Sequence, residues 1–289
     1  MHFTSAKGLL SAKNGMNIYR GCTHGCIYCD SRSLCYGMRH DFTDVEVKIN
    51  APELLENALR SKRKKCMIGT GSMSDPYNHC EDELHLTRKC AEIALEYNFG
   101  FTFITKSDKF LRDIDIYKDI NENSKCVVQM TLTTYDERLC TVIEPNVSGT
   151  LARYNALKVL QKEGIPSVVW LSPILPFIND TRENMRGILD YCFDADVRGI
   201  IYFGAGLTLR EGNREYYYEK LDKHFPGMKT KYIKTFGSSY ECESPNNGAL
   251  NKLFYSECER YGVLCRPNEV FGYLNEYDDR YAGEQLSMF

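Results

Sequence analysis

The sequence has no long hydrophobic run and little excess charge of either sign. No stretch of its 289 residues approaches the roughly 20 apolar residues needed to span a membrane. The first residues lack the basic start and apolar core of a signal peptide. With 36 basic and 39 acidic residues, the net charge of −3 creates no global field toward nucleic acid. These absences predict a cytoplasmic protein without a membrane partner, and they neither show nor exclude DNA binding.

The sequence also lacks internal repeats, low-complexity segments and a long linker. Its 13 cysteines are odd in number and irregularly spaced, which argues against a disulfide framework. A hydrophobic content of 43% and a charged content of 26% are ordinary for a globular protein. We therefore expect one large domain, or a domain with an appendage, whose cysteines are free thiols or metal ligands.

Short apolar runs alternate with amphipathic segments along most of the chain. This alternation predicts an α/β fold with a parallel sheet, and six units favour a partial (β/α)6 TIM-like barrel over a full eightfold one. We expect the barrel over residues 1–205 and a C-terminal extension over 206–289. The expected strands are Met16–Arg20, Cys66–Thr70, Phe101–Thr105, Cys126–Thr131, Ser167–Leu171 and Gly199–Phe203. The expected helices are Ala51–Ser61, Glu83–Tyr97, Lys109–Ile120, Thr150–Lys162, Arg182–Phe193 and Gly248–Tyr261.

Three cysteines directly follow the first expected strand. Cys22, Cys26 and Cys29 have the spacing C-x3-C-x2-C, with Tyr28 before the last cysteine. Structural zinc sites and iron–sulfur clusters normally take four protein ligands, so three thiolates leave one metal position open. The alternative is a zinc site, for which a fourth ligand would come from His24, Cys35 or His40.

Polar side chains follow the other expected strands. Gly69–Tyr77 follows the second strand with two glycines and several hydroxyl groups, and Lys106 follows the third strand. Thr131 ends the fourth strand, in alternation with polar neighbours on one face. Ligands of parallel α/β folds bind at the carboxyl ends of strands. These residues are therefore expected to line the same mouth as the cysteines.

The cysteine motif and the strand-end segments resemble the radical S-adenosylmethionine (SAM) superfamily, and within it the group of spore photoproduct lyase, which reverses a thymine–thymine DNA lesion. The resemblance covers roughly residues 15–205 and implies that Cys22, Cys26 and Cys29 bind a [4Fe–4S] cluster whose fourth iron is chelated by SAM. By the same resemblance, the residues expected to bind the cofactor are Tyr28, Ser72, Ser74, Lys106, Thr131, Ser172 and Phe203.

The sequence departs from that group at Ser72. This serine stands where the lyase has the cysteine that returns a hydrogen atom to the product radical. A serine O–H bond is much stronger than a thiol S–H bond, so Ser72 is a poor hydrogen donor. We therefore expect an enzyme other than spore photoproduct lyase, unless Cys35, Cys140 or Cys242 supplies the thiol.

The last five residues form a second motif. Gln285, Leu286, Ser287, Met288 and Phe289 resemble the peptide with which bacterial polymerases and repair proteins bind the replication sliding clamp. The alternative is an apolar terminus folded against its own domain. If the tail binds the clamp, it places the enzyme on DNA without a basic surface.

The function predicted from the sequence is therefore reductive cleavage of SAM to a 5′-deoxyadenosyl radical, which abstracts hydrogen from a nucleic-acid base or DNA lesion. A reducing partner such as flavodoxin or ferredoxin is expected. One alternative is radical modification of a peptide or small metabolite. Another is a non-catalytic, zinc-bearing protein recruited to DNA by the clamp.

Overall fold

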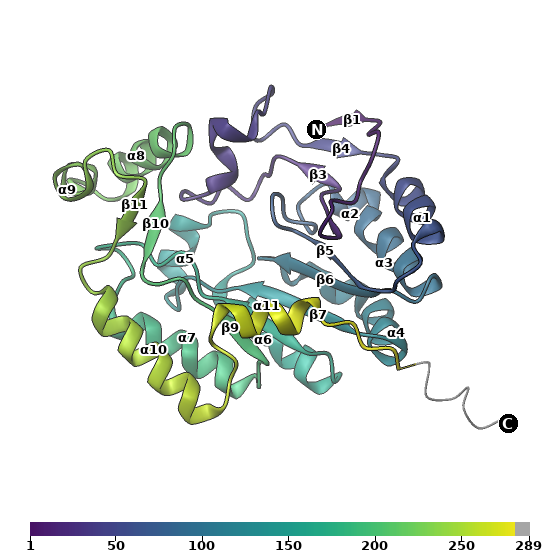
Figure 1. The fold of residues 1–289 in the computed structure, drawn as a ribbon. Helices are drawn as coiled ribbons and strands as arrows, with labels where there is room; N and C mark the ends of the chain where they lie inside the picture. The colour runs from purple at the N-terminus through teal and green to yellow at the C-terminus, as the bar shows by residue number, and fades with distance from the viewer. Residues whose placement is uncertain (281–289) are drawn as a thin grey trace, which may run out of the picture.

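The protein is built around a sheet of six parallel strands. The structure is a computed structural model and describes residues 1–280. Neighbouring strands follow one another in chain order, with β2 and β9 at the two edges, as in a partial TIM-like barrel (Figure 1). The strands are β2 (Gly15–Met16), β5 (Met67–Thr70), β6 (Gly100–Thr105), β7 (Cys126–Thr131), β8 (Ser167–Trp170) and β9 (Gly199–Ile201). The predicted fold class is confirmed.

Alternate residues of the central strands face two apolar layers. Val128 and Val169 pack into the main core with the helices outside the sheet, and Val127 and Val168 face the other side. There Val270 and Leu274 of α11 (Pro267–Asn275) cover the sheet, and Figure 1 shows this helix crossing the strands. Both faces of the strands are thus buried, which explains their nearly continuous apolar sequences. The helices that connect the strands include α1 (Ala51–Ser61), α3 (Leu86–Glu96), α4 (Ile114–Asn123), α6 (Thr150–Lys162) and α7 (Arg182–Asp194).

Three predicted elements are divided in the structure. The first predicted strand, Met16–Arg20, is wrong as one strand, because β3 (Tyr19–Arg20) pairs with β4 (Glu46–Lys48) in a separate sheet. The predicted helix Glu83–Tyr97 is interrupted at His85, whose φ of 51° separates α2 (Glu81–Leu84) from α3. The segment predicted as Lys109–Ile120 begins as a 3₁₀ helix, η3 (Asp108–Asp113), before α4.

Two small sheets flank the barrel. β1 (His2–Thr4) pairs with β4 to complete a three-stranded sheet, and β10 (Gly206–Thr208) pairs with β11 (Glu241–Glu243) in an antiparallel ladder. None of these ladders was predicted from the sequence. The short helices between the barrel elements are η1 (Asp30–Arg32), η2 (Leu34–Tyr36) and α5 (Glu137–Ile143).

The C-terminal segment packs on the barrel. It contains α8 (Asn213–His224), α9 (Met228–Phe236) and α10 (Asn247–Tyr261), and Leu250 and Phe254 of α10 join the main core. The proposed boundary at residue 205 stays a prediction. The clamp-binding motif at residues 285–289 lies outside the described residues, so it also stays a prediction. Within residues 1–280, no helix is both long and apolar enough to cross a membrane.

Candidate active site

The cysteine loop is held in place by backbone contacts that only certain residues permit. Gly21 has a φ of +90°, and a Cβ atom there would lie 2.6 Å from the carbonyl oxygen of Phe42. The next amide, of Cys22, donates to that same oxygen at 2.9 Å. Farther along, Ile27 donates to the carbonyl of Ile143 at 3.0 Å. These bonds tie the loop to two distant parts of the chain.

The three thiols of the loop lie at the edge of the barrel mouth. Cys22 and Cys26 are buried, whereas Cys29 is partly exposed and lines the main cavity. Burial, with the nearby charge of Asp75, raises the pKa of Cys22 to about 12, and burial raises the pKa of Cys26. Such thiols become thiolates only beside a strong cationic centre, because a coordinated thiol is deprotonated by its metal.

The spacing of these thiols fits a cluster better than a zinc ion. A tetrahedral zinc with Zn–S bonds of about 2.3 Å places its ligand atoms about 3.8 Å apart. Among residues 1–280, neither the loop cysteines alone nor these cysteines with His24, Cys35 or His40 form a group of three ligand atoms within 4.8 Å. A four-iron cluster binds each thiolate on a different iron and so accepts a wider spacing. The donor set therefore fits a [4Fe–4S] cluster.

The proposed fourth zinc ligands point elsewhere. His24 is buried with its Nδ1 atom 3.5 Å from Asp75 Oδ2, and burial lowers its pKa. Cys35 is exposed and accepts from Arg210 at 3.2 Å. His40 lies in a different cluster, beside His2. The zinc alternative is not supported by this arrangement.

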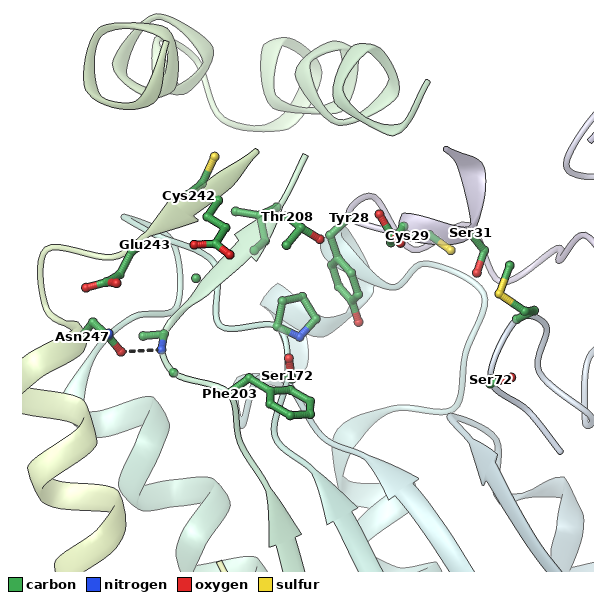
Figure 2. Close-up of a pocket in the computed structure, with 18 of the residues that line it drawn as sticks. Tyr28, Cys29, Ser31, Ser72, Ser172, Phe203, Thr208, Cys242, Glu243 and Asn247 are labelled. Carbon is green, nitrogen blue, oxygen red and sulfur yellow. Dashed lines mark hydrogen bonds between the residues drawn. The ribbon is translucent and has the colours of Figure 1, made fainter. Parts of the chain in front are cut away.

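A cavity of about 590 Å³ opens at the carboxyl ends of the strands. Figure 2 shows Cys29 and Ser72 at one side of this cavity and Glu243 at the other. The cavity brings together six of the residues that the sequence predicted, from five separate segments of the chain: Tyr28, Cys29, Ser72, Lys106, Ser172 and Phe203. This is the part of a parallel α/β barrel where ligands bind.

Lys106 carries a charge into this cavity. Burial alone would lower its pKa, but the Cys26 thiol and the Glu144 carboxylate outweigh that effect and raise it. Its Nζ atom lies 5.9 Å from the centre of the Tyr28 ring. Lys106 is therefore an ammonium ion at neutral pH, placed at the cavity beside the cysteine loop.

Asp75 connects this lysine to the cysteine loop. Its carboxylate accepts from the hydroxyl of Thr105 at 2.8 Å and from the backbone amide of Lys106 at 2.7 Å. The same carboxylate faces His24 of the cysteine loop. The chain after β5 thus fixes both the end of β6 and the loop. The sequence marked Asp75 only as one of several polar residues in a turn.

A buried ionic network lies behind Tyr28. The Tyr28 hydroxyl donates to Glu144, which also accepts from Arg153 at 2.6 Å and from Thr133 at 3.1 Å. Burial alone would raise the pKa of Glu144, but Arg153 and then Lys106 lower it, so the carboxylate is ionised. Arg153 donates its other nitrogen to the carbonyl of Thr131 at 2.8 Å. Sequence reasoning missed Glu144 and Arg153, because nothing in the local sequence shows that Glu144, which follows α5, meets Arg153 of α6.

Two other predicted cofactor residues do not line the cavity. The hydroxyl of Ser74 is buried and donates to the carbonyl of Gly21 at 2.5 Å. Thr131 is buried in β7, where its carbonyl accepts from Arg153. Ser74 therefore supports the cysteine loop, and Thr131 supports the Arg153 side chain, without lining the cavity.

The three thiols considered as hydrogen donors lie in different surroundings. Cys35 is exposed outside the cavity, and Cys140 is buried with its Sγ atom 3.0 Å from Arg153. Cys242 lines the cavity, but its side chain belongs to an apolar cluster with Leu207 and Tyr217. In Figure 2 its sulfur points away from the cavity.

The wall opposite the cysteine loop is acidic and aromatic. Glu241 and Glu243 of β11 flank the buried Cys242 and line the cavity, with no side-chain hydrogen bond or ion pair among residues 1–280. Phe203 is 59% exposed at the base of this wall (Figure 2). The sequence indicated Phe203, but it gave no sign that β11 would return to the cavity.

Comparison with known proteins agrees with this geometry. Residues 16–192 match the sequence profile of the Radical SAM superfamily. The chain belongs to this superfamily. Radical SAM proteins use a [4Fe–4S] cluster and SAM, and these are the cofactors of this chain.

Solved structures share the fold at low sequence identity. A spore photoproduct lyase complexed with dinucleoside spore photoproduct has a TM-score of 0.64 at 14% identity, covering 91% of this chain and 78% of that one. The tryptophan-bound methyltransferase TsrM of Kitasatospora setae has a TM-score of 0.52 at 12% identity, covering 89% of this chain and 52% of that one.

Sequence relatives are closer but mostly uncharacterized. An uncharacterized protein of Methanocaldococcus jannaschii is 34% identical over 58% of this chain and 63% of its own length. One of Mycobacterium bovis is 26% identical over 76% of this chain and 66% of its own length. The chain thus spans slightly less than two thirds of these relatives. A radical SAM Nalpha-GlyT isomerase of Pseudomonas phage M6 is 25% identical over 58% of this chain and 34% of its own length.

Proposed function

We propose that Cys22, Cys26 and Cys29 bind the [4Fe–4S] cluster and that SAM occupies the adjoining part of the 590 Å³ cavity. The observation that carries this proposal is a three-thiol loop that opens, through Cys29, onto a cavity containing the ammonium group of Lys106. Three thiolates leave one iron for a non-protein ligand, and a half-buried ammonium group suits the carboxylate of SAM.

The residues on the side of the cavity next to the cysteine loop have separate roles in this proposal. Lys106 pairs with the SAM carboxylate, while Tyr28 packs against the adenine and is oriented by its hydrogen bond to Glu144. Ser72 reaches the cavity and contacts SAM directly. Ser74 and Thr131 act indirectly, because the Ser74 hydroxyl holds Gly21 and the Thr131 carbonyl holds Arg153.

Reductive cleavage of SAM at the cluster supplies a 5′-deoxyadenosyl radical that takes a hydrogen atom from the substrate. The protein positions the two cofactors and keeps water and competing hydrogen donors away from them. Electrons reach the cluster from a small reductant such as flavodoxin or ferredoxin. Because Ser72 is not a thiol and Cys242 packs among apolar side chains, the product radical is not quenched as in spore photoproduct lyase.

The substrate is a nucleic-acid base, or a group attached to one. The exposed ring of Phe203 offers a surface on which a base can stack, with Ser172 beside it in the cavity. Glu241 and Glu243 repel phosphate, so the sugar–phosphate backbone stays outside while a neutral or amine-bearing base enters. The shared fold with a lyase that binds a dinucleoside lesion supports this choice by analogy.

One observation favours a second substrate class. The unpaired carboxylates of Glu241 and Glu243 also suit the amino group of a peptide or small metabolite.

Deuterium transfer from the substrate to 5′-deoxyadenosine distinguishes the two substrate classes. The reconstituted, reduced enzyme is incubated with SAM and either fully deuterated DNA or fully deuterated cellular peptides and metabolites. Deuterium in 5′-deoxyadenosine only with DNA is the expected result, and deuterium only with the second mixture would overturn the nucleobase proposal.

A further inference from the structure

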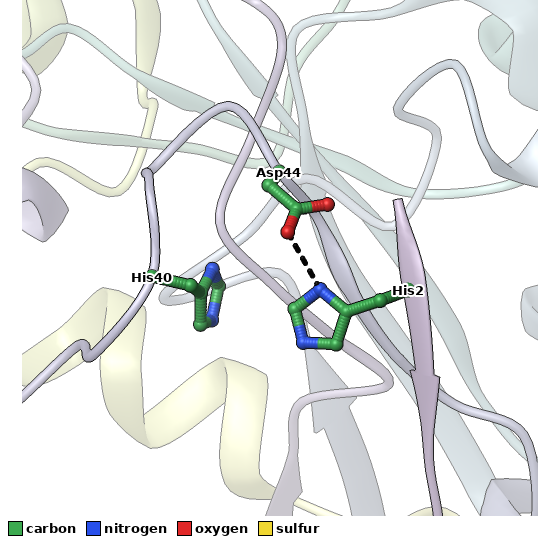
Figure 3. Close-up of side chains that lie close together, drawn as sticks. All are labelled: His2, His40 and Asp44. Carbon is green, nitrogen blue, oxygen red and sulfur yellow. Dashed lines mark hydrogen bonds and ion pairs between the residues drawn. The ribbon is translucent and has the colours of Figure 1, made fainter.

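Two histidines and two carboxylates come together at the small sheet formed by β1, β4 and β3. The ligand atoms of His2, His40 and Asp44 lie within 4.8 Å of one another, and no other group of three such residues is this compact within residues 1–280. Glu46 Oε2 lies 3.7 Å from Nε2 of His40 and 4.0 Å from Nε2 of His2. Figure 3 shows the two imidazole rings side by side, with Asp44 above them.

Strand pairing brings these residues together. β1 and β4 are parallel neighbours whose register sets His2 directly opposite Glu46. The chain between β3 and β4 then carries His40 and Asp44 to the same end of this sheet, where the two rings meet edge to face at 4.8 Å. The arrangement is thus a consequence of the unpredicted three-stranded sheet.

The hydrogen bonds of His40 leave one nitrogen free. Its Nδ1 atom lies 2.9 Å from the carbonyl oxygen of Asp41, which only accepts, so Nδ1 carries the proton. Its Nε2 atom is buried, has no hydrogen-bond partner within residues 1–280 and lies 3.7 Å from the carboxylate of Glu46. A buried polar atom without a partner, beside a carboxylate, marks a position that a cation can fill.

The ring nitrogens of His2 also face carboxylates. Its Nδ1 atom lies 2.9 Å from Oδ2 of Asp44, and its Nε2 atom lies 4.0 Å from Oε2 of Glu46. Two imidazole rings that meet carboxylates at one place have the donor types of a metal site. The other oxygen of Asp44 lies 3.1 Å from the amino group of Met1.

We propose that this cluster binds a divalent transition-metal ion of the zinc or ferrous type. Its ligands are one ring nitrogen of His2, one ring nitrogen of His40 and a carboxylate oxygen of Asp44, the three atoms that lie within 4.8 Å of one another, and Glu46 adds a second carboxylate beside the two rings. Imidazole and carboxylate donors together suit such ions. Because His2 and His40 are partly exposed, solvent reaches the site and supplies the remaining ligands.

The ion braces the segment on which the cysteine loop rests. His40 and Asp44 lie on either side of Phe42, whose carbonyl oxygen accepts from the amide of Cys22. Fixing this segment to β1 and β4 holds that acceptor in place. The site is structural and separate from the SAM cavity, so its occupancy is measured without reference to catalysis.

Zinc retention tests the proposal on the cluster-loaded enzyme, in which the loop thiolates are already occupied. The protein is incubated anaerobically with Zn²⁺, desalted, and analysed for zinc and iron by mass spectrometry. We expect one zinc per chain with iron unchanged. His40→Gln and Asp44→Asn should each lower zinc occupancy at least tenfold, and Glu46→Gln, which removes the carboxylate beside both rings, should lower the affinity for zinc by about tenfold. His224→Ala, an exposed histidine on α8, is the matched control and should retain zinc.

Unfolding provides a second measurement that does not depend on desalting. Zn²⁺ should raise the denaturation midpoint of the cluster-loaded wild type and of His224→Ala, but not of His40→Gln, because only a ligand bound to the folded state stabilises it. Absence of zinc from the wild type, or equal retention by His40→Gln and Glu46→Gln, would overturn the proposal. In that event a proton shared by His40 and Glu46 is the cation that occupies the site.

Discussion

The two walls of the 590 Å³ cavity are built differently. On the side of the cysteine loop, Glu144 and Arg153 are buried, Asp75 is partly buried, and each is bonded to several partners. On the opposite side, Glu241 and Glu243 stand on a short hairpin and make no side-chain bonds within residues 1–280. The first wall has a geometry that its own interactions determine, as a cofactor requires. The second has polar groups left free for a partner, as a substrate site requires.

The largest effect is expected from breaking the buried ion pair of the first wall. Glu144→Ala leaves the fully buried guanidinium of Arg153 without its counter-ion, which should cost about 3–5 kcal/mol of unfolding free energy. Urea unfolding measures this loss. Glu96→Ala, at an exposed position on α3, is the control and should change stability by less than about 0.5 kcal/mol. Equal effects of the two substitutions would remove the distinction between the walls.

The next effect concerns SAM binding. Lys106→Met removes the ammonium group from the cavity, and a lost bond between charged groups is worth about 1.5–3 kcal/mol, or about 10–150-fold in the dissociation constant of SAM. Equilibrium binding to the cluster-loaded enzyme measures it. Lys109→Met is the control, because Lys109 is exposed and pairs with Asp82. Unchanged affinity in Lys106→Met would show that SAM binds elsewhere.

A thiol placed on the first wall, at Ser72, should lead to deuterium in the product of SAM cleavage. Ser72→Cys adds an S–H group to the cavity, and this hydrogen exchanges with solvent. During substrate-free SAM cleavage in D₂O, the variant should yield deuterated 5′-deoxyadenosine, whereas wild type and Ser72→Ala should not. Mass spectrometry of 5′-deoxyadenosine measures its deuterium content. Deuterium in the wild-type product would mean that another thiol reaches the cavity.

The smallest effect on cofactor chemistry is expected at the second wall. Glu241→Gln and Glu243→Gln should leave stability within about 0.5 kcal/mol and SAM cleavage unchanged, because both residues are exposed and neither side chain has a hydrogen bond or ion pair with the first wall among residues 1–280. Their effect should appear only in the affinity for substrate, which competition between deuterated substrates measures. A loss of SAM cleavage in these variants would assign the hairpin to the cofactor.

Much of the first wall could be predicted from the sequence, because its signals are local. The spacing of Cys22, Cys26 and Cys29 and the polar residues after each strand are visible in a linear reading, and so are the six strands. His85 shows the limit of such reading. It separates α2 from α3 with a left-handed backbone, a conformation that residues other than glycine seldom adopt and that its neighbours in sequence do not indicate.

The parts that were missed depend on contacts between distant segments. Glu144 and Arg153 meet beneath Tyr28, 116 residues from Glu144 along the chain. β11 has only three residues, with the alternation Glu-Cys-Glu, which is too short to predict a strand. The cluster of His2, His40 and Glu46 depends on the register between β1 and β4, which the sequence does not encode locally.

The most direct test of the account is SAM cleavage by the reconstituted protein. The chain is loaded with iron and sulfide without oxygen, reduced in the presence of SAM, and assayed for 5′-deoxyadenosine. The account predicts a brown protein with four irons per chain that forms this product, and a Cys26→Ala variant that does not. A colourless wild type that holds one zinc at the cysteine loop and leaves SAM intact would contradict it.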